Sequence, residues 1–480
     1  MSASGLKWIL SLTVSAWLLQ GCADRRLLRF QKVAAAAGND NYAGALAQVK
    51  KNKTLYGKES RLLYLMDLGI LYHYSGKYDS SNMALSEAVA IHDDLFAKSV
   101  TNEAASFLVN DNIRPYRGKP YEIVLLHEFL AFNYLALGKH DDAMVEARQA
   151  QIFLDEVKRK AGKNDKEYRD DGMFRYLTAI LYQAGKQRDD AAISMYQAVK
   201  AYRNGSVSLP PSVVNQAAAT LKSAERMDDI KELGLENVPV ATSDVSESEI
   251  IVIGYAGRSP ALGQNVFWGT YARDGMLVIH YHNAKGDVVT EVLPAPGLPP
   301  SQIDRARKGQ KTRSGTTFHV KFAMPSLKPV PLQTQFFTVA GEAAPNPVRS
   351  EALTDLHPLL TQNLEANHAA ILTRTVIRVA LRTVAAQETK SAISGGNPIV
   401  NLILNIGTDL LSDQLEQADT RNWFLLPRTI QIARIPVKPG VHSITVEAHN
   451  AAGATLGAKS FEGLTVKPGE KKFVFYSSLK

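Results

Sequence analysis

Gly138-Lys139-His140-Asp141-Asp142-Ala143 is a sharp turn between two stretches with a helical pattern, and related turns occur twice more in the chain. The other copies are Gly76-Lys77-Tyr78-Asp79 and, with one additional residue, Gly185 to Ala191. Glycine ends a helix in the left-handed conformation at little cost. A carboxylate in the first turn of the following helix stabilises its positive end, so the aspartates are interpreted as helix-start residues and not as catalytic ones. The pattern predicts three helical hairpins.

The three copies resemble the tetratricopeptide repeat, because a small residue and an aromatic residue precede each turn and alanines follow it. The resemblance implies a stacked helical array with a preformed concave surface for a protein partner. Regular arrays repeat every ~34 residues, and the wider spacing here predicts additional segments. Further helices are expected over Leu27 to Lys50, Ser80 to Leu108 and Ser212 to Leu233.

A polar loop, Asn110 to Glu122, lies between the first two copies. Two prolines and a glycine prevent a continuous helix there, and its Arg, Tyr and Asn side chains are of the types that dominate recognition surfaces. The same composition also suits a structural spacer in which Tyr116 and Tyr121 fix the loop onto neighbouring helices, and both interpretations stay open. The candidate partner-binding residues are Asn110, Asn112, Arg114, Tyr116, Arg117, Lys119 and Tyr121.

The C-terminal half has a different periodicity. Short β-branched and aromatic runs bounded by Gly and Pro predict strands. A helical pattern from Glu351 to Ala392 interrupts them and places Arg374, Arg378 and Arg382 on one face. The expected strands are Ile250–Ile253, Met276–His282, Phe318–Met324, Gln335–Val339, Ile430–Ile435, Ser443–Ala448 and Phe473–Ser477.

The predicted fold class is multidomain, α plus α+β. It consists of an N-terminal tetratricopeptide-like α-helical array and a C-terminal β-sandwich-like module with an inserted helical segment. The expected divisions are a signal peptide over 1–21, a helical domain over 22–241, a linker over 242–249 and a β-rich module over 250–480 with its helical segment at 351–418.

The N-terminus is typical of a secretory signal. Lys7 precedes the apolar run Trp8 to Leu19, which is too short for the roughly 20 residues of a membrane span. The junction Leu19-Gln20-Gly21-Cys22 resembles a bacterial lipoprotein signal, which implies cleavage before Cys22 and acyl chains on it. In such lipoproteins an aspartate directly after the cysteine favours retention at the inner membrane. Residue 23 is alanine, so the resemblance implies the outer membrane. The alternative is a plain secretory signal that contains a buried cysteine.

Composition excludes several classes of protein. With 45% hydrophobic and 21% charged residues the chain is globular, and a formal charge of +8 over 480 residues does not argue for nucleic-acid binding. Cys22 is the only cysteine, so no intrachain disulfide stabilises the fold.

Two motifs resemble those of an uncharacterised family of proteobacterial lipoproteins with tetratricopeptide-like helices. One is Asn110 to Glu122 followed by Leu125-Leu126-His127, and the other is Ala418-Asp419-Thr420-Arg421-Asn422-Trp423. The family has no established enzymatic reaction. Its members tend to be encoded beside curli-secretion-type outer-membrane lipoproteins, so the resemblance implies such a lipoprotein as the protein partner. It also makes Asp419, Arg421 and Trp423 a second candidate surface.

Motifs for catalysis are missing from the sequence. There is no Gly-x-Ser-x-Gly elbow or phosphate-binding glycine loop, and His127-Glu128 lacks the second histidine of a zinc protease. His280 and His282 share a strand face without an evident third ligand. We therefore predict no enzyme, no catalytic residue, no cofactor and no metal. The basic segment 302–313 is a further candidate for binding an acidic partner.

The sequence thus predicts an outer-membrane-anchored periplasmic lipoprotein that acts as a protein–protein interaction scaffold in envelope assembly or secretion. Its partners would be the membrane, through the N-terminal lipid, and another protein, with no nucleic acid. The alternatives are a cell-wall-active enzyme without a recognisable motif and an accessory subunit of a secretion pore.

Overall fold

The computed structural model describes residues 25–99, 114–161, 170–240, 248–272, 276–282, 288–294, 317–368, 371–372, 374–375 and 418–480. Several sequence predictions fall outside these residues and are not addressed by the structure: the signal peptide 1–21, Cys22, Asn110, Asn112, the basic segment 302–313, Arg378 and Arg382.

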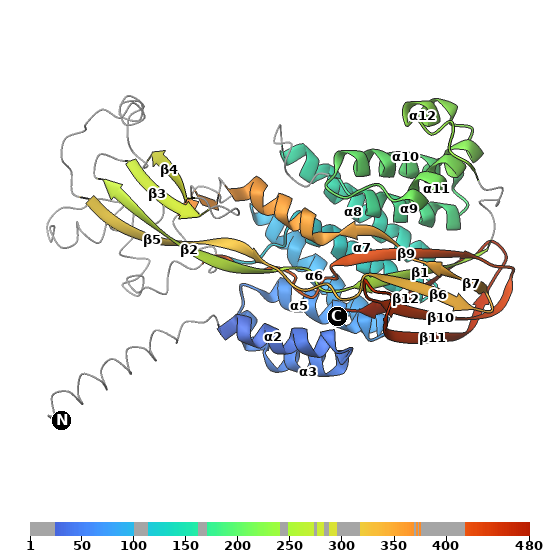
Figure 1. Ribbon diagram of the computed structural model, residues 1–480, viewed down its shortest axis with the longest axis horizontal. Helices are drawn as coiled ribbons and strands as arrows, with labels where there is room; N and C mark the ends of the chain where they lie inside the picture. The colour runs from blue at the N-terminus through green and yellow to red at the C-terminus, as the bar shows by residue number, and fades with distance from the viewer. Residues whose placement is uncertain are drawn as a thin grey trace.

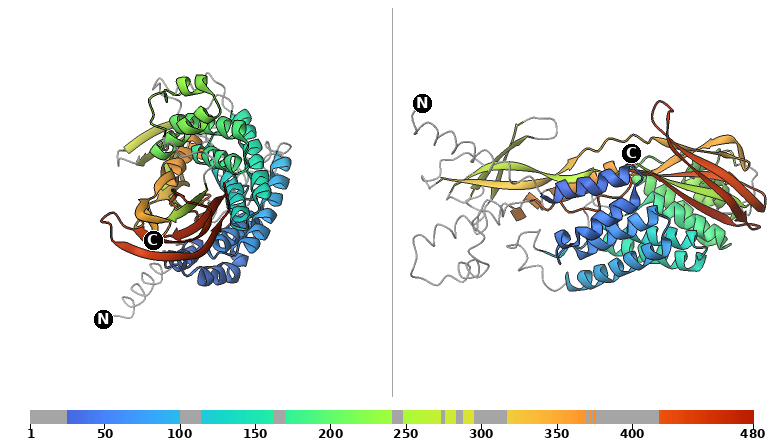
Figure 2. Two further views of the ribbon diagram at one scale, coloured as in Figure 1. Left: turned by 90° about the vertical axis from the view of Figure 1, so that its right-hand side faces the viewer. Right: turned by 90° about the horizontal axis from the view of Figure 1, so that it is seen from below.

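Helical hairpins stacked in an arc form the first half of the protein (Figures 1 and 2). The predicted tetratricopeptide-like array is confirmed, and the described residues contain two further hairpins, α2–α3 and α11–α12, beyond the three predicted. The helices are α2 (Arg25–Gly38), α3 (Tyr42–Lys51), α4 (Lys53–Tyr56), α5 (Arg61–Tyr74), α6 (Tyr78–Ser99), α7 (Pro120–Ala136), α8 (His140–Ala161), α9 (Gly172–Ala184), α10 (Arg188–Asn204), α11 (Pro211–Ser223) and α12 (Met227–Glu232).

The turns of these hairpins share one backbone geometry. In the first predicted copy, Gly76 is left-handed (φ +70°) and the amide of Lys77 donates to the carbonyl of Tyr72 at 2.9 Å, which caps the end of α5. The third copy corrects our expectation, because Gly185 has a φ of −79° and Lys186 is the left-handed residue (φ +58°). The left-handed positions of the five turns are Asp40, Gly76, Gly138, Lys186 and Glu225.

Two helices that we expected to be continuous are broken at such turns. The segment Leu27 to Lys50 turns at Asp40, and Ser212 to Leu233 turns at Glu225. Neither turn contains glycine at the left-handed position, so the sequence lacked the usual signal for a helix end.

Small residues allow the two helices of a hairpin to pack closely, as the repeat pattern predicted. A Cβ atom on Gly69 of α5 would lie 2.3 Å from Leu85 Cδ2 of α6. No larger residue fits at this crossing without moving the leucine.

Strands fill the second half and form three four-stranded sheets. Their orders are β12-β1-β9-β8, β11-β10-β6-β7 and β4-β3-β2-β5. The strands are β1 (Glu249–Ala256), β2 (Ala261–Ala272), β3 (Met276–His282), β4 (Val288–Pro294), β5 (Thr317–Lys328), β6 (Phe336–Gly341), β7 (Ala344–Arg349), β8 (Glu351–Asp355), β9 (Thr429–Pro436), β10 (Gly440–His449), β11 (Thr455–Val466) and β12 (Lys471–Ser478).

The sheet β12-β1-β9-β8 is buried on both faces. Ile250 and Val252 of β1 point into a core shared with β6 and β10, so the first two sheets form the predicted sandwich. Ile251, Ile253 and Tyr255 alternate with them and pack into the core of the helical array. The uninterrupted apolar run Ile250 to Ile253 is therefore typical of a strand covered on both sides.

The concave side of the helical arc is filled by this sheet (Figure 2). We had expected that side to offer a surface to a protein partner, and the structure shows that it is covered by the chain itself. Side chains from both sides of the proposed linker 242–249 share one hydrophobic core. The domain boundaries stay predictions.

The third sheet projects from the body as an arm (Figure 1). β2 and β5 pair along 12 residues each, from Ala261 opposite Lys328 at the base to Ala272 opposite Thr317. The expected helix from Glu351 is also corrected, since Glu351–Asp355 is strand β8 and the helix begins at residue 356. The described residues of this helix lie within 356–375, and its buried Leu356 and Leu360 join the core of the helical array.

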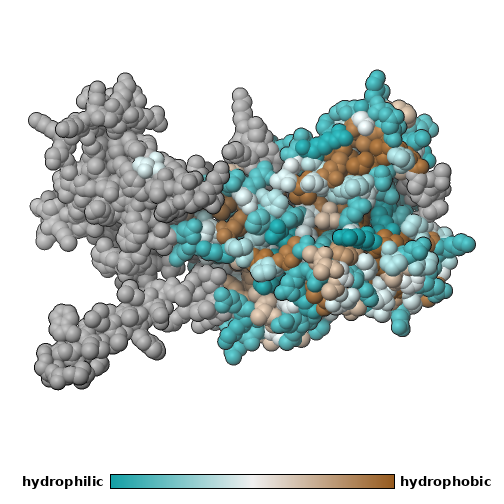
Figure 3. Space-filling view, viewed as in Figure 1, coloured by the Kyte–Doolittle hydropathy of each residue, from teal (hydrophilic) through white to brown (hydrophobic). Residues whose placement is uncertain are grey.

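No helix among the described residues has both the length and the apolar character needed to cross a membrane. The face in Figure 3 is largely polar, with an apolar area around α9, α10 and α11.

Candidate functional site

The two motifs that the sequence singled out lie against each other, although about 300 residues separate them. Arg421 Nη1 donates to the carbonyl of Arg114 at 2.9 Å, and Lys119 Nζ donates to the carbonyl of Arg421 at 3.2 Å. The guanidinium of Arg421 also lies 5.3 Å from the centre of the Tyr116 ring, a cation–π contact. The loop before α7 and the segment before β9 therefore form one site.

Glu122 joins the two motifs at their buried side. Its carboxylate accepts hydrogen bonds from the Tyr116 hydroxyl at 2.5 Å and the Lys119 amide at 2.8 Å, and from the amide of Trp423 at 2.8 Å. Tyr116 and Tyr121 are buried, and Trp423 is completely inaccessible. The burial of Tyr116 and Tyr121 agrees with the alternative in which these two residues fix the loop onto its neighbours, and the partner-binding role of the loop stays a prediction.

Asp419 and Arg421 form a bidentate ion pair, with Nε–Oδ1 at 2.8 Å and Nη2–Oδ2 at 2.7 Å. Burial alone raises the pKa of Asp419, but the guanidinium of Arg421 outweighs burial and holds the pKa below its ordinary value. Arg421 is thereby fixed in place for its contacts with Tyr116 and Arg114.

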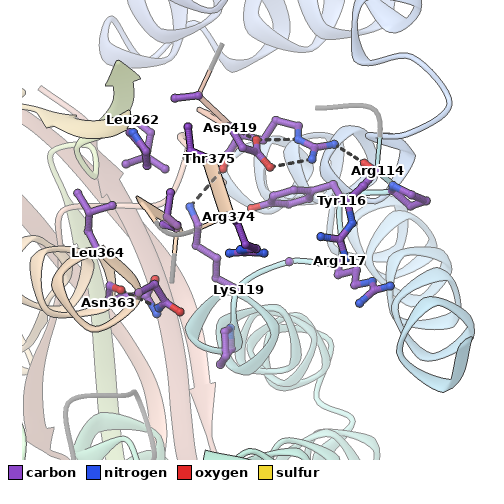
Figure 4. A pocket seen from close by; sticks show the side chains of 18 of the residues that line it. Arg114, Tyr116, Arg117, Lys119, Leu262, Asn363, Leu364, Arg374, Thr375 and Asp419 are labelled. Carbon is purple, nitrogen blue, oxygen red and sulfur yellow. Dashed lines mark hydrogen bonds and ion pairs between the residues drawn. The ribbon is translucent and has the colours of Figure 1, made fainter. Parts of the chain in front are cut away.

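A pocket of about 330 Å³ opens beside this junction (Figure 4). The loop residues 114–120 line one side, and the base of the arm and the helix within 356–375 line the other. Figure 4 shows Leu262 and Leu364 opposite Arg114 and Arg117, with Lys119 between these two sides. This volume lies within the range of small-molecule sites in proteins.

The described lining of the pocket contains five cationic side chains. Its described lining contains one carboxylate, Asp419, which Arg421 already neutralises. Burial lowers the pKa of Lys119. The carboxylates of Glu122 and Asp419 raise this pKa, but by less than burial lowers it, so it stays below its ordinary value. The cationic side chains of the lining are Arg114, Arg117, Lys119, Arg374 and Arg421.

The structure thus places Arg114, Arg117, Lys119, Asp419 and Arg421 together around one pocket. It adds an apolar wall that sequence analysis missed: Leu262, Ala323, Leu364 and Ile371. These residues come from two strands and a helix far apart in the chain, so no local pattern could have identified them.

The other candidate groups for chemistry are described only in part. Within the described residues, no group of three or more His, Cys, Asp and Glu side chains is placed to hold a metal ion. His127 Nδ1 lies 2.7 Å from Glu146 Oε2, which explains this histidine as a structural residue. The backbone places His280 opposite Trp268 and Thr290 in neighbouring strands.

A buried chain of hydrogen bonds was also not foreseen. His73 Nε2 lies 2.9 Å from the Tyr255 hydroxyl, and His73 Nδ1 lies 2.7 Å from Asn133 Oδ1. Asn133 Nδ2 donates to Ser81 Oγ, which donates to the carbonyl of Gly69. Burial lowers the pKa of His73 to about 4, so the ring is neutral and accepts from Tyr255 while donating to Asn133. This chain connects three helices to strand β1.

No family model and no curated protein matches the chain. Among solved structures, it is similar to the TPR-like repeats of a putative kinesin light chain of Podosopora anserina, with 18% identity over 44% of this chain and 91% of that chain and a TM-score of 0.30.

Two further solved structures show similar values. MamA of AMB-1 is 14% identical over 45% of this chain and 94% of that chain, with a TM-score of 0.26. BtubC of P. vanneervenii is 12% identical over 45% of this chain and 79% of that chain, with a TM-score of 0.28. The tetratricopeptide-like character of the array rests on its own hairpin geometry, and not on these similarities.

Proposed function

We propose that this protein is a lipoprotein, anchored to the outer membrane through Cys22, that acts as a non-enzymatic scaffold for another envelope protein in assembly or secretion. The anchor is supported by the apolar run and the Leu19-Gln20-Gly21-Cys22 junction. Several acyl chains together hold a protein stably in a bilayer, since each buried methylene contributes about 0.8 kcal/mol.

The observation that carries the scaffold proposal is a row of exposed apolar side chains on the outer helices. Met83 is 77% exposed, Val145 49% and Ile193 44%. Each of them follows the left-handed residue of its hairpin by seven positions, so they are equivalent in α6, α8 and α10. Equivalent positions of stacked hairpins align, and aligned apolar residues mark interaction sites more often than scattered ones do. We name these three residues the outer stripe.

The outer stripe replaces the concave face as the proposed partner surface. The inner helices face inward: His73 contacts Tyr255 of β1, and Tyr176 contacts Arg434 of β9. Phe129 packs against Trp423 of the segment before β9. The outer helices carry the exposed row. The implied partner is a co-encoded curli-secretion-type lipoprotein, which anchoring in the same membrane would concentrate near the stripe.

The pocket gives less support to the alternative that this protein is a cell-wall-active enzyme. Glycoside hydrolases use two carboxyl groups across the scissile bond, whereas the described lining of the pocket offers Asp419 alone, already paired with Arg421.

Photo-crosslinking in cells tests the scaffold proposal. A photoreactive residue at Val145 is expected to capture one defined envelope protein, identified by mass spectrometry. The matched control is the same residue at Glu462, which is exposed on β11 away from the stripe. If both positions capture the same proteins, or Val145 captures none, the outer stripe is not a docking surface.

The anchor is tested separately by metabolic labelling with palmitate and by membrane fractionation. Wild-type protein is expected to be labelled and to sediment with outer membranes, and Cys22→Ala is expected to lose the label. An unlabelled wild-type protein would disprove the lipoprotein assignment.

A further inference from the structure

A second, smaller cavity lies where three helices of the array meet the sheet. α7, α8 and α9 supply most of its wall, and β12 contributes Phe473. The wall contains a buried carboxyl group, Glu128 of α7, and a buried hydroxyl group, Thr178 of α9. Most of the other residues of the wall are apolar, among them Leu135 and Leu177. The cavity is therefore a small polar site bordered by apolar side chains.

Three polar atoms of this wall have no hydrogen-bond partner. They are both carboxyl oxygens of Glu128 and Oγ1 of Thr178, which are buried and form no hydrogen bond with the described residues. The two residues are only 4% and 9% exposed. Buried polar atoms nearly always bond to protein or to ordered water, because an unpaired one costs free energy. A ligand that pairs with both residues would remove this cost.

The size of the cavity restricts the ligand. The cavity leaves the centre of a water molecule about 20 Å³ of space, and about 10–15 Å³ is enough to hold one water. A pocket for an organic ligand measures roughly 300 Å³ or more. This cavity therefore accommodates only a single small molecule or ion.

The available oxygen atoms distinguish water from a metal ion. A buried water makes about three hydrogen bonds, and Glu128 and Thr178 offer three oxygen atoms. Hard cations take about six or more oxygen ligands, and no group of metal-binding side chains occurs among the described residues. His127 also borders the cavity, but its Nδ1 lies 2.7 Å from Glu146 Oε2. Size and chemistry therefore both favour water.

We propose that this cavity binds one ordered water molecule, which bridges the carboxyl group of Glu128 and the hydroxyl group of Thr178. The bridge connects α7 to α9, and so joins two neighbouring hairpins at the point where they meet β12. It gives the buried carboxyl group the hydrogen-bond partner that it lacks among the described side chains. The site is separate from the outer stripe and does not depend on the scaffold function.

High-resolution crystal structures of the full-length protein in detergent test the site directly. The wild type is expected to show one density peak at hydrogen-bond distance from both Glu128 and Thr178. Thr178→Val keeps the shape of the side chain but removes the hydroxyl, so the peak is expected to lose its contact with residue 178. The wild-type structure needs no substitution and stays decisive if a variant fails to fold.

A double-mutant cycle tests the bridge in solution, with urea unfolding of wild type, Thr178→Val, Glu128→Met and the double variant. With a bridging water, Thr178→Val destabilises the wild type but not Glu128→Met, in which the bridge is already broken. The expected coupling is about fivefold in the unfolding equilibrium constant. The matched control is Thr220→Val, whose lost hydroxyl bonds to the Gln216 carbonyl at 2.7 Å. It is expected to act equally in both backgrounds.

Four outcomes would overturn the proposal. The first two are a wild-type crystal structure without density in the cavity and a direct hydrogen bond between Glu128 and Thr178 in place of the water. The third is an equal effect of Thr178→Val in both backgrounds, which would show that its hydroxyl has no link to Glu128. The fourth is a peak with oxygen contacts clearly shorter than hydrogen bonds, which would identify a metal ion.

Discussion

The two faces of the helical array differ in what covers them. On the inner face, Phe129 and Tyr255 lie in a continuous core with β1, and the rings pack 5.5 Å apart. On the outer face, Met83 and Val145 are exposed at equivalent positions of the repeat. A tetratricopeptide-like pattern therefore does not imply an open concave groove, because the chain's own sheet can occupy it.

Trp423→Ala should have the largest effect. Trp423 is completely buried, and its ring packs edge-on against Phe129 at 5.8 Å between centroids. Removing the ring should lower the free energy of unfolding by about 3–5 kcal/mol, the range for large aromatic residues in a core. Urea unfolding followed by circular dichroism and by tyrosine fluorescence measures it.

The same experiment tests whether array and sheet are one cooperative unit. Because both contribute to one core, the two signals should shift together to a lower urea concentration. Two separate transitions, with only one of them shifted, would show that the halves unfold independently.

Tyr255→Phe and Tyr196→Phe form a matched pair, one on each face. Removing the Tyr255 hydroxyl leaves buried His73 Nε2 without its partner and should cost about 1–3 kcal/mol. Tyr196 donates to Glu232 at 2.6 Å at the surface, and losing that bond should cost clearly less than losing the Tyr255 hydroxyl, because water replaces the bond. Thermal or urea unfolding compares the two. Equal losses would contradict the assignment of a buried polar chain to the inner face.

Glu128→Gln should have the smallest effect, and that effect should depend on pH. Burial raises the pKa of Glu128 well above its ordinary value, and neither carboxyl oxygen has a hydrogen-bond partner in the described structure. The folded state therefore favours the protonated form, so stability falls as pH rises from the unfolded pKa through the higher folded pKa. Glutamine cannot ionise, so the variant should lose this pH dependence.

The measurement is the unfolding midpoint of wild type and Glu128→Gln across pH 4–8. The two midpoints should lie close together at the acidic end, and the variant should be the more stable by about 2 °C or more at the basic end. Parallel curves for the two proteins would contradict a raised pKa at Glu128.

The features that the sequence predicts correctly are those set by residues close together in the chain. Gly76 and Gly138 adopt the left-handed turns expected of them, and Ile250 to Ile253 lies in a strand as expected. These features depend on residues close together in the chain, where backbone sterics and apolar periodicity act directly. The hairpins at Asp40 and Glu225 were missed because non-glycine residues adopt the same conformation there.

The candidate site was predicted in part. The motifs around Arg117 and Arg421 were identified separately, and only the fold places them in one pocket. Their sequence did not show that Tyr116 and Tyr121 are buried, because that depends on Glu122 and on the segment ending at Trp423.

The sequence by itself determined three of the described helical hairpins and the change to strands near residue 250, because both depend on local residue types and spacing. For the same reason it gave the lipoprotein-like junction at Cys22 as a testable prediction. Only the tertiary structure decided that β1 fills the concave face and that Lys119 lies beside Arg421. Those arrangements bring together segments hundreds of residues apart, and burial there is decided by the packing of the whole chain.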